Sequence, residues 1–476
     1  MDDGDMTTWP QRDDHPVVLV TLDGLGDRPC RSLGGRTPSE AARTPVLDEL
    51  TRRAAGGVHV PFGPGWATSS ERSHWAMFGM GTVAFPGRAV LELLGVGGHP
   101  PLSTPMWHLA IRRGERSNRA DGAMMITGRL GREQHDVSAI AGAVLADYCA
   151  CTRIDDIEFE IVALRVGEWV LTARGAMSHE ISDTDPLFDN RHPWMRPLPI
   201  REAIEAGGAR EVQAMRMSNA MEQFLLGAHD ALHRSGIDYD VPTTKWASWI
   251  DGGASFADEV GVTGAMVTSS ALYRGLARYL GMLEIDVSAP AGDLALGLSD
   301  RVAAAVSLID DSPRTDAGRI DFVHVHTKAP DEAGHTKDPA AKIAAIEACD
   351  AALTALVDRL DRDDFVLAVT GDHATPSETL LLHSGDPTPF IVAGPDVRID
   401  DVDAFGETSL LSGSLGRLRA DDIAPLLHGL ARRPFFIGHR PGAGISAALP
   451  STPAAMPPGS RDFPPVPPPT YEESHA

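Results

Sequence analysis

The chain has 476 residues, of which 43% are hydrophobic, so it is long enough to bury one large core and a second domain. Its 42 basic and 66 acidic side chains give a formal net charge of −24, which argues against nucleic acid as a partner because binding to the phosphate backbone needs a basic face. No apolar run approaches the roughly 20 residues of a membrane span, and the acidic start of the chain lacks the basic and apolar regions of a signal peptide, so we expect a cytoplasmic protein with no membrane partner.

The first predicted strand is Val17–Leu22, which follows a polar leader formed by residues 1–16. It is apolar and rich in β-branched residues, as buried strands are. The strand ends in Asp23-Gly24, and Gly24 lets the chain turn sharply where a side chain would crowd a bound ion. Asp23 is therefore a candidate metal ligand.

The next informative segment is a stretch rich in Gly, Pro and Ser that carries Ser69 to His74. The composition alone predicts that its serines are ordinary loop hydroxyls. A serine next to a metal site, however, can act as a nucleophile. Ser70 is the candidate, and we expect His74 to pack or cap beneath this loop. A helix is predicted near Ala89–Leu94.

Residues 105–240 are predicted to be an insertion in the domain formed by residues 17–104 and 241–445. Its predicted strands are Met124–Thr127, Glu160–Leu164 and Trp169–Thr172, and a helix is predicted at Ser218–Arg234 from its apolar spacing. The core resumes with predicted helices at residues 269–283, 294–309 and 340–360. Alternating strands and helices predict a mostly parallel sheet covered on both faces.

Two further strand-like runs precede carboxylates and imidazoles. Phe322–His326 is followed by Asp331 and His335, and Phe365–Val369 is followed by Asp372, His373 and His383. The carboxyl ends of parallel strands line the crevice where α/β sheets bind ligands. Asp and His together favour Zn²⁺ or Mn²⁺ over Ca²⁺ or a thiolate-selecting metal. His324 and His326, which alternate along the first strand, are expected to be structural.

Eight segments, in this order and spacing, make the chain resemble the cofactor-independent phosphoglycerate mutases, especially their archaeal-type branch, within the alkaline phosphatase superfamily. The segments are Asp23–Pro29, Gly35–Pro45, Ser70–Gly79, Pro86–Arg88 with Leu91–Gly95, Ile181–Pro186, Lys328–His335, Asp372–Pro376 and His383–Pro389. The resemblance implies an alkaline-phosphatase-like α/β core, with a mostly parallel sheet covered by helices on both faces, and a smaller inserted α+β domain that binds substrate as a lid.

The same resemblance implies two divalent metal ions, Mn²⁺ or Zn²⁺, and a serine that is phosphorylated during turnover. Asp23, Ser70, Asp372 and His373 match the ligands of one ion, and Asp331, His335 and His383 match those of the other. Ser70 matches the phosphorylated serine. Because phosphoryl transfer depends on charge stabilisation, Lys328 and Arg88 are expected to add positive charge near the transferred group.

The resemblance weakens in the insertion, where the family holds the carboxylate and phosphate of its substrate. Departures fall at Ile126-Thr127, at Glu158–Glu160 and at Asp238–Trp246, and several expected arginines are missing. A neutral side chain cannot replace a bidentate Arg contact to a carboxylate. Five arginines could form a rebuilt anion site, although each is also compatible with a solvated surface position: Arg129, Arg132, Arg165, Arg191 and Arg196.

These observations predict a phosphoglycerate mutase-like isomerase of glycolysis, or a close relative acting on a small phosphorylated acid. One alternative is a phosphatase or transferase that acts on another phosphorylated or phosphonylated metabolite in a specialised pathway. The other is a non-catalytic scaffold that binds partners through the Pro-rich tail at residues 446–476, whose Pro467–Tyr471 run contains a pattern of the kind that WW domains bind. That tail is expected to be disordered, and the complete set of seven metal-site residues argues against the scaffold.

Overall fold

The structure is a computed structural model of the chain, and it describes residues 14–118, 122–185, 192–311, 314–315, 318–360, 362, 364–435 and 437–438. The described residues from 14 to 435 belong to one compact unit. Almost all of the predicted polar leader and the whole of the predicted tail at residues 446–476 lie outside the described residues, as does Arg191. None of the described helices combines the length and the hydropathy that a bilayer crossing requires.

In the described part of the chain, nine strands form a core sheet in the order β11-β10-β13-β1-β14-β15-β2-β16, with β12 beside β13. The five strands from β11 to β14 run parallel, whereas β15 is antiparallel to both of its neighbours. The strands are β1 Val17–Leu22, β2 Ala55–His59, β10 Thr263–Thr268, β11 Leu283–Asp286, β12 Arg314–Thr315, β13 Gly318–Thr327, β14 Val366–Thr370, β15 Thr388–Ala393 and β16 Gly416–Leu418.

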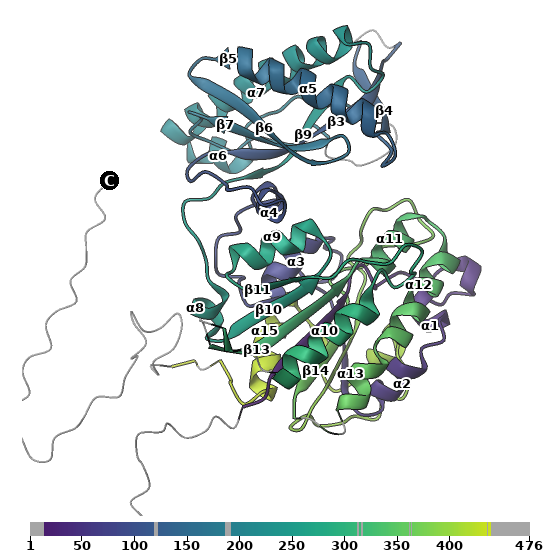
Figure 1. Cartoon of the computed structure of the whole chain (residues 1–476). Helices are drawn as coiled ribbons and strands as arrows, with labels where there is room; N and C mark the ends of the chain where they lie inside the picture. The colour runs from purple at the N-terminus through teal and green to yellow at the C-terminus, as the bar shows by residue number, and fades with distance from the viewer. Residues whose placement is uncertain are drawn as a thin grey trace, which may run out of the picture. The chain divides into compact units, whose positions relative to one another are not determined.

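Helices cover both faces of the core sheet (Figure 1). They are α1 Pro38–Ala41, α2 Pro45–Thr51, α3 Ser70–Met77, α4 Arg88–Gly95, α8 Phe256–Val260, α9 Ala271–Tyr279, α10 Leu298–Asp311, α11 Ala329–His335, α12 Pro339–Ala352, α13 Thr354–Arg359, α14 Glu407–Leu410 and α15 Ala420–Leu430, with a 3₁₀ turn at Arg31–Leu33.

Strand β1 shows why both faces need cover, because every one of its side chains is buried. Val18, Val20 and Leu22 pack in a cluster with residues of α2, α10, α12 and α13. Val17 and Leu19 point to the opposite face and pack with residues of α3, α8, α9 and α15. Alternate side chains point to opposite faces of a strand, so an unbroken apolar run is what a parallel strand buried on both sides requires. The predicted fold class is confirmed.

A second, antiparallel sheet of seven strands lies within residues 106–248 of the described chain, and we call it the insert sheet. Its order is β5-β6-β7-β3-β4-β8, with β9 paired to β3. The strands are β3 Met106–Arg116, β4 Met124–Arg129, β5 Arg153–Ile154, β6 Ile157–Arg165, β7 Glu168–Arg174, β8 His192–Pro193 and β9 Val241–Ser248, and the helices are α5 His135–Cys151, α6 Arg201–Ala206 and α7 Gly208–Arg234. Residues of α5 and α7 share a hydrophobic cluster with this sheet.

Several element boundaries differ from those expected from the sequence. Helix α7 begins at Gly208, ten residues before the predicted start, and α10 spans Leu298–Asp311 where residues 294–309 were predicted. The insert sheet continues past residue 240 because β9 hydrogen-bonds along β3 as far as Ser248. Helix α9 ends at Tyr279, since Gly281 takes a left-handed conformation with φ 65° and β11 begins two residues later. The predicted helix at residues 340–360 is two helices, α12 and α13, which meet at Leu353.

Two glycines bring the backbones of α4 and α9 into direct contact. A Cβ atom on Gly95 would lie 1.8 Å from the Ala271 carbonyl oxygen, and one on Gly275 would lie 1.7 Å from the Leu91 carbonyl oxygen. No real Cβ contact is that short, so either substitution must push the helices apart. This contact holds α4, whose first residue is Arg88, against α9.

We therefore expect Gly275→Ala to lower the free energy of unfolding by about 1–3 kcal/mol or more, the usual scale of overpacking. The matched control is Gly429→Ala in α15, where a Cβ would meet nothing within 4 Å. There the higher helix propensity of Ala should stabilise the protein by about 0.5–1 kcal/mol. Urea unfolding of both variants measures the difference, and equal stability of Gly275→Ala and the wild type would contradict the helix contact.

Candidate active site

The site lies at the carboxyl end of three adjacent parallel strands of the core sheet. Strand β1 pairs with β13 on one side and with β14 on the other. Asp23 follows β1, Lys328 and α11 follow β13, and Asp372 and His373 follow β14. Side chains that lie 300 residues apart in the sequence therefore meet at one edge, as the strand pattern predicted.

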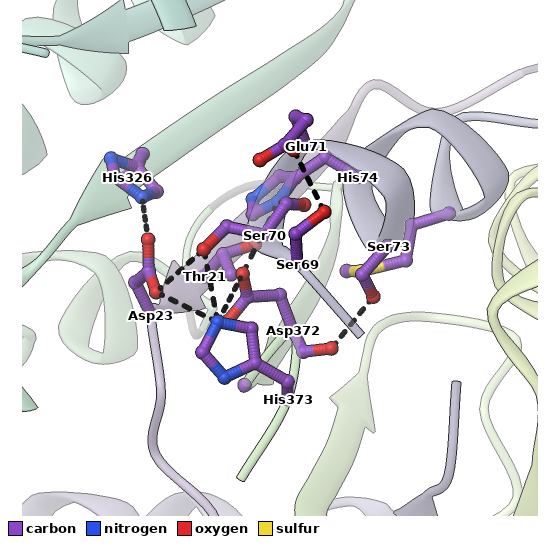
Figure 2. A network of polar contacts seen from close by, with 12 residues as sticks. Thr21, Asp23, Ser69, Ser70, Glu71, Ser73, His74, His326, Asp372 and His373 are labelled. Carbon is purple, nitrogen blue, oxygen red and sulfur yellow. Dashed lines mark hydrogen bonds and ion pairs between the residues drawn. The ribbon is translucent and has the colours of Figure 1, made fainter. Parts of the chain in front are cut away.

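One group of potential ligands surrounds Ser70, the first residue of α3. The ligand atoms of Asp23, Asp372 and His373 all lie within 4.8 Å of one another. Ser70 Oγ is 3.3 Å from Asp23 Oδ1 and 2.9 Å from His373 Nε2. Figure 2 shows the Ser70 hydroxyl pointing between these two side chains. A buried hydroxyl is thus held against a carboxylate and an imidazole.

A second group adjoins the first through His373. The ligand atoms of Asp331, His373 and His383 also lie within 4.8 Å of one another, and the His373 and His383 rings stack with centroids 3.9 Å apart. His335 joins through Asp331, whose Oδ1 lies 3.2 Å from His335 Nε2. The structure thus brings all seven candidate ligands together, with His373 within reach of both groups.

Lys328 lies between the two groups. Its Nζ donates to Asp23 Oδ2 at 2.9 Å and lies 3.0 Å from Asp331 Oδ2. Burial alone would lower the pKa of Lys328, but the carboxylates of Asp23 and Asp331 raise it above its ordinary value. Burial would likewise raise the pKa of Asp23, yet the Lys328 ammonium and a hydrogen bond from His326 hold it well below its usual range. Both carboxylates are therefore ionised at neutral pH, as metal ligands must be.

Asp372 has an acceptor that the protein does not satisfy. Gly24 N donates to its Oδ1 at 2.9 Å, whereas Oδ2 is buried and has no hydrogen-bond partner among the described residues. Burial and the nearby Asp23 charge raise the pKa of Asp372. A buried carboxylate oxygen without a partner is costly, and a cation would remove that cost. With the surrounding carboxylates and imidazoles, this donor set fits Zn²⁺ or Mn²⁺.

Buried residues around the two groups fix the orientation of the candidate ligands. Tyr273 Oη donates to Asp23 Oδ2 at 3.0 Å, and His326 Nε2 lies 3.0 Å from the same oxygen. Thr375 Oγ1 donates to Asp331 Oδ1 at 2.7 Å. The sequence offered no motif for Tyr273, which is a lone polar residue within an otherwise ordinary segment. Thr375 lies in the Asp372–Pro376 segment of the resemblance, but that segment did not indicate its contact with Asp331. His326 therefore has the structural role that the strand pattern suggested, and its partner is a candidate ligand.

His74 lies beneath the serine loop, as expected. Its Nδ1 is 2.8 Å from the Ser70 carbonyl oxygen and 3.5 Å from Asp372 Oδ2. Burial lowers the pKa of His74 to about 4, so the ring is neutral at neutral pH. His324 is also buried, and its Nε2 lies 3.0 Å from Thr21 Oγ1.

Arg88 contacts the residue that follows Ser70. Its guanidinium is 3.1 Å from Glu71 Oε2 and 3.1 Å from Glu92 Oε1, and it lies over the Trp246 ring. Burial alone would lower the pKa of Arg88, but the two carboxylates raise it. The charge of Arg88 is thus matched by two carboxylates of the protein at the base of the serine loop.

Three of the insertion arginines also pair with carboxylates of the protein. Arg132 lies 3.6 Å from Glu332, and Arg165 and Arg196 pair with Glu168 and Glu222. Arg129 is exposed.

The sequence did not single out a buried cluster in the insert sheet. Arg112 Nε and Lys245 Nζ lie 3.0 and 2.8 Å from Asp185 Oδ2. Burial lowers the pKa of Lys245 to about 8, although the Asp185 charge acts in the opposite direction. Arg112 and Lys245 come from β3 and β9, and no local sequence pattern predicted that these two strands pair.

The sequence of the chain is similar to those of known metalloenzymes. A sequence model of the metalloenzyme superfamily matches residues 15–428. The chain is 30% identical over 448 residues to 2,3-bisphosphoglycerate-independent phosphoglycerate mutase 2 of Methanocaldococcus jannaschii, covering 91% of this chain and 97% of that protein. It is 31% identical to the 2,3-bisphosphoglycerate-independent phosphoglycerate mutase of Pyrococcus furiosus, covering 87% of this chain and 97% of that protein.

Two solved structures are also similar to this chain. A protein from Pyrococcus horikoshii has a TM-score of 0.69 at 26% identity, covering 89% of this chain and 99% of that chain. The cofactor-independent phosphoglycerate mutase of Thermoplasma acidophilum has a TM-score of 0.56 at 25% identity, covering 88% of this chain and all of that chain. The similarity therefore includes both the core sheet and the insert sheet.

Proposed function

This chain belongs to the cofactor-independent phosphoglycerate mutases of the metalloenzyme superfamily, and we propose that it transfers a phosphoryl group through a phosphoserine formed at Ser70. The observation that supports this most is the position of the Ser70 hydroxyl, which lies between Asp23 and His373 where two groups of metal-ligating side chains adjoin. It is the feature that a nucleophile for phosphoryl transfer needs.

Two divalent ions, Mn²⁺ or Zn²⁺, are proposed to take part. Asp23, Ser70, Asp372 and His373 would hold one, and Asp331, His335 and His383 would hold the other, with His373 near both. When bound, such ions lower the pKa of a coordinated hydroxyl and neutralise charge on phosphoryl oxygens. The unsatisfied Asp372 Oδ2 supports this assignment.

The protein's own groups account for the remaining requirements of the transfer. Ser70 Oγ forms a bond to phosphorus as the bond from phosphorus to the substrate oxygen breaks, and the phosphoryl group then passes to an acceptor oxygen. Lys328 keeps a positive charge between Asp23 and Asp331, close to the transferred group. Arg88 pairs with Glu71, the residue that follows Ser70, and so stabilises the serine loop. The pair places the positive charge of Arg88 beside the neighbour of the nucleophile.

We further propose that the insertion closes on the substrate. The ion pair between Arg132 of the insertion and Glu332 of α11, one residue from Asp331, supports this role. A mutase must keep water from the phosphoserine while it holds the dephosphorylated product, and an enzyme that fails to do so is a phosphatase.

The second candidate function is phosphatase or transferase activity on a different phosphorylated or phosphonylated metabolite. It is favoured by the pairing of Arg165 and Arg196 with Glu168 and Glu222, and of Arg112 and Lys245 with Asp185. Guanidinium groups already matched by protein carboxylates bind a substrate carboxylate less well, because the new contact must displace the old one.

We therefore expect weak interconversion of 3- and 2-phosphoglycerate, with kcat/KM below the ordinary enzyme range of about 10⁴–10⁸ M⁻¹s⁻¹. Loss of charged hydrogen bonds worth about 1.5–3 kcal/mol each would reduce binding of phosphoglycerate by orders of magnitude. The measurement is a coupled mutase assay that also records free phosphate. The Pyrococcus furiosus relative, tested under the same conditions, is the positive control. A kcat/KM for this chain inside that range would show that the insertion holds glycerate after all.

A further inference from the structure

A cavity of about 420 Å³ adjoins the serine loop. Ser69 and Glu71, the neighbours of Ser70, contribute to its wall, as do Arg72 and Arg88. Figure 2 shows the hydrogen bond between Ser69 Oγ and Glu71 beside Ser70. Because consecutive Cα atoms are only about 3.8 Å apart, the wall of this cavity begins one residue from Ser70 on either side along the chain. Its volume is in the usual range of small-molecule sites, about 300–1,000 Å³.

Four aromatic or heteroaromatic side chains contribute to the rest of the wall. Phe85, His179, Trp246 and Trp249 all line the cavity. The His179 and Trp249 rings stack with an interplanar angle of 24° and centroids 5.5 Å apart. Burial lowers the pKa of His179, so its ring is neutral. Flat, uncharged faces of this kind bind other planar groups by stacking.

Trp246 is held in a strained backbone conformation. Its φ is 54°, in the left-handed region that bulky residues rarely adopt. Asp183 Oδ1 accepts a hydrogen bond from Trp246 N at 2.9 Å, and β9 is irregular at this point in its pairing with β3. Strain of this kind persists only where the surroundings enforce it and is concentrated at functional sites. The fold thus maintains a tryptophan ring in the wall of this cavity.

The pairing of Arg88 disfavours a substrate carboxylate beside that residue of the cavity wall. Arg88 lies over the Trp246 ring at 4.1 Å and pairs with Glu71 and Glu92, which are both buried. Arg72 lies over the Phe85 ring at 4.8 Å. An incoming carboxylate would meet Glu71 in the wall and would have to compete with Glu71 and Glu92 for Arg88. An uncharged planar group meets neither penalty.

On the basis of the proposed function, we infer that this cavity holds the organic part of the substrate and that this part is planar and uncharged. The substrate class is a phosphorylated or phosphonylated compound that carries an aromatic, heteroaromatic or similarly flat group, larger than glycerate. The phosphoryl group then lies at Ser70 and the flat group lies between Trp246, Trp249 and Phe85.

The test compares two phosphonates that differ only in the organic group. Calorimetry with the metal-loaded full-length protein gives the affinity for phenylphosphonate and for methylphosphonate. We expect phenylphosphonate to bind at least about tenfold more tightly, which corresponds to about 1.4 kcal/mol. Trp249→Leu and Trp246→Gly should each remove that advantage. Trp246→Gly adds no backbone strain, because glycine adopts positive φ freely.

The matched control is Trp194→Leu, which removes a tryptophan of the insertion that is outside the cavity wall and should keep the phenyl advantage. Equal affinity of the wild type for the two phosphonates overturns the inference and leaves the role of Ser70 intact. An advantage that survives both cavity variants places the ring elsewhere and overturns it too. If neither phosphonate binds and Ser70 is never phosphorylated, the proposed function itself fails. The comparison in the wild type is decisive even where a variant does not fold.

Discussion

Ser70→Ala is expected to fold like the wild type and to lose turnover almost completely. The substitution removes one oxygen that is both a proposed metal ligand and the proposed attacking atom. Among the described residues, Ser70 has the hydroxyl that contacts both Asp23 and His373. Removal of a catalytic nucleophile costs on the order of 10³–10⁶ in rate. The hydrogen bonds that are lost contribute only about 1 kcal/mol each to stability. Turnover and thermal unfolding of the same preparation separate the two effects.

Ser69→Ala is the matched control for this experiment. Ser69 precedes the nucleophile, is less buried and donates to Glu71 Oε1 at 2.7 Å. Ser69 lines the proposed substrate cavity, so its loss is expected to weaken substrate binding but to leave the transfer to Ser70 in place. Mass spectrometry of the trapped intermediate should therefore find the phosphoryl group on Ser70 in both the variant and the wild type. Near-normal activity of Ser70→Ala would refute the assignment, and a phosphoryl group on Ser69 would move the nucleophile by one residue.

Removal of metal is expected to abolish activity, and Mn²⁺ or Zn²⁺ should restore it. Without a cation the site leaves Asp372 Oδ2 without a hydrogen-bond partner among the described residues, and it brings the ionised carboxylates of Asp23 and Asp331 together around Lys328. Asp331→Ala and Asp372→Ala should each lose at least about one ion per chain, because each removes an anionic ligand from one of the two groups. Elemental analysis of the purified variants measures the loss.

Asp350→Asn tests whether that loss is specific to the site. Asp350 is a buried carboxylate that accepts hydrogen bonds from Leu47 N and Val46 N, and it belongs to neither ligand group. This variant should lose stability and keep its full metal content. If a chelator leaves the rate of the wild type unchanged, the two-metal mechanism is wrong.

The sequence by itself determined the fold class and the composition of the proposed metal site. An unbroken apolar run such as Val17–Leu22 is recognisable because a parallel strand must bury both of its faces. Asp23, Asp331 and Asp372 each follow such a run, and adjacent parallel strands deliver their carboxyl ends to the same edge. Local patterns were therefore sufficient to bring the candidate ligands together.

The environment of that site was decided by contacts between distant segments, which leave no local pattern. Tyr273 and Thr375 orient Asp23 and Asp331 only because α9 and the loop after β14 are packed against them. Whether an arginine is available to a substrate depends on which carboxylate it meets, as Arg88 shows with Glu71 and Glu92.

Contacts between distant segments also form the cavity wall. Trp246 lines it because β9 pairs irregularly with β3, and Phe85 and His179 join it from segments nearly a hundred residues apart. The residue types at the reaction centre follow from the sequence, since strand ends position Asp23, Asp372 and His373, while Ser70 and His335 come from the segments that form α3 and α11. The shape and charge of the space that selects the substrate follow from the tertiary structure, since they depend on which side chains are packed together around it.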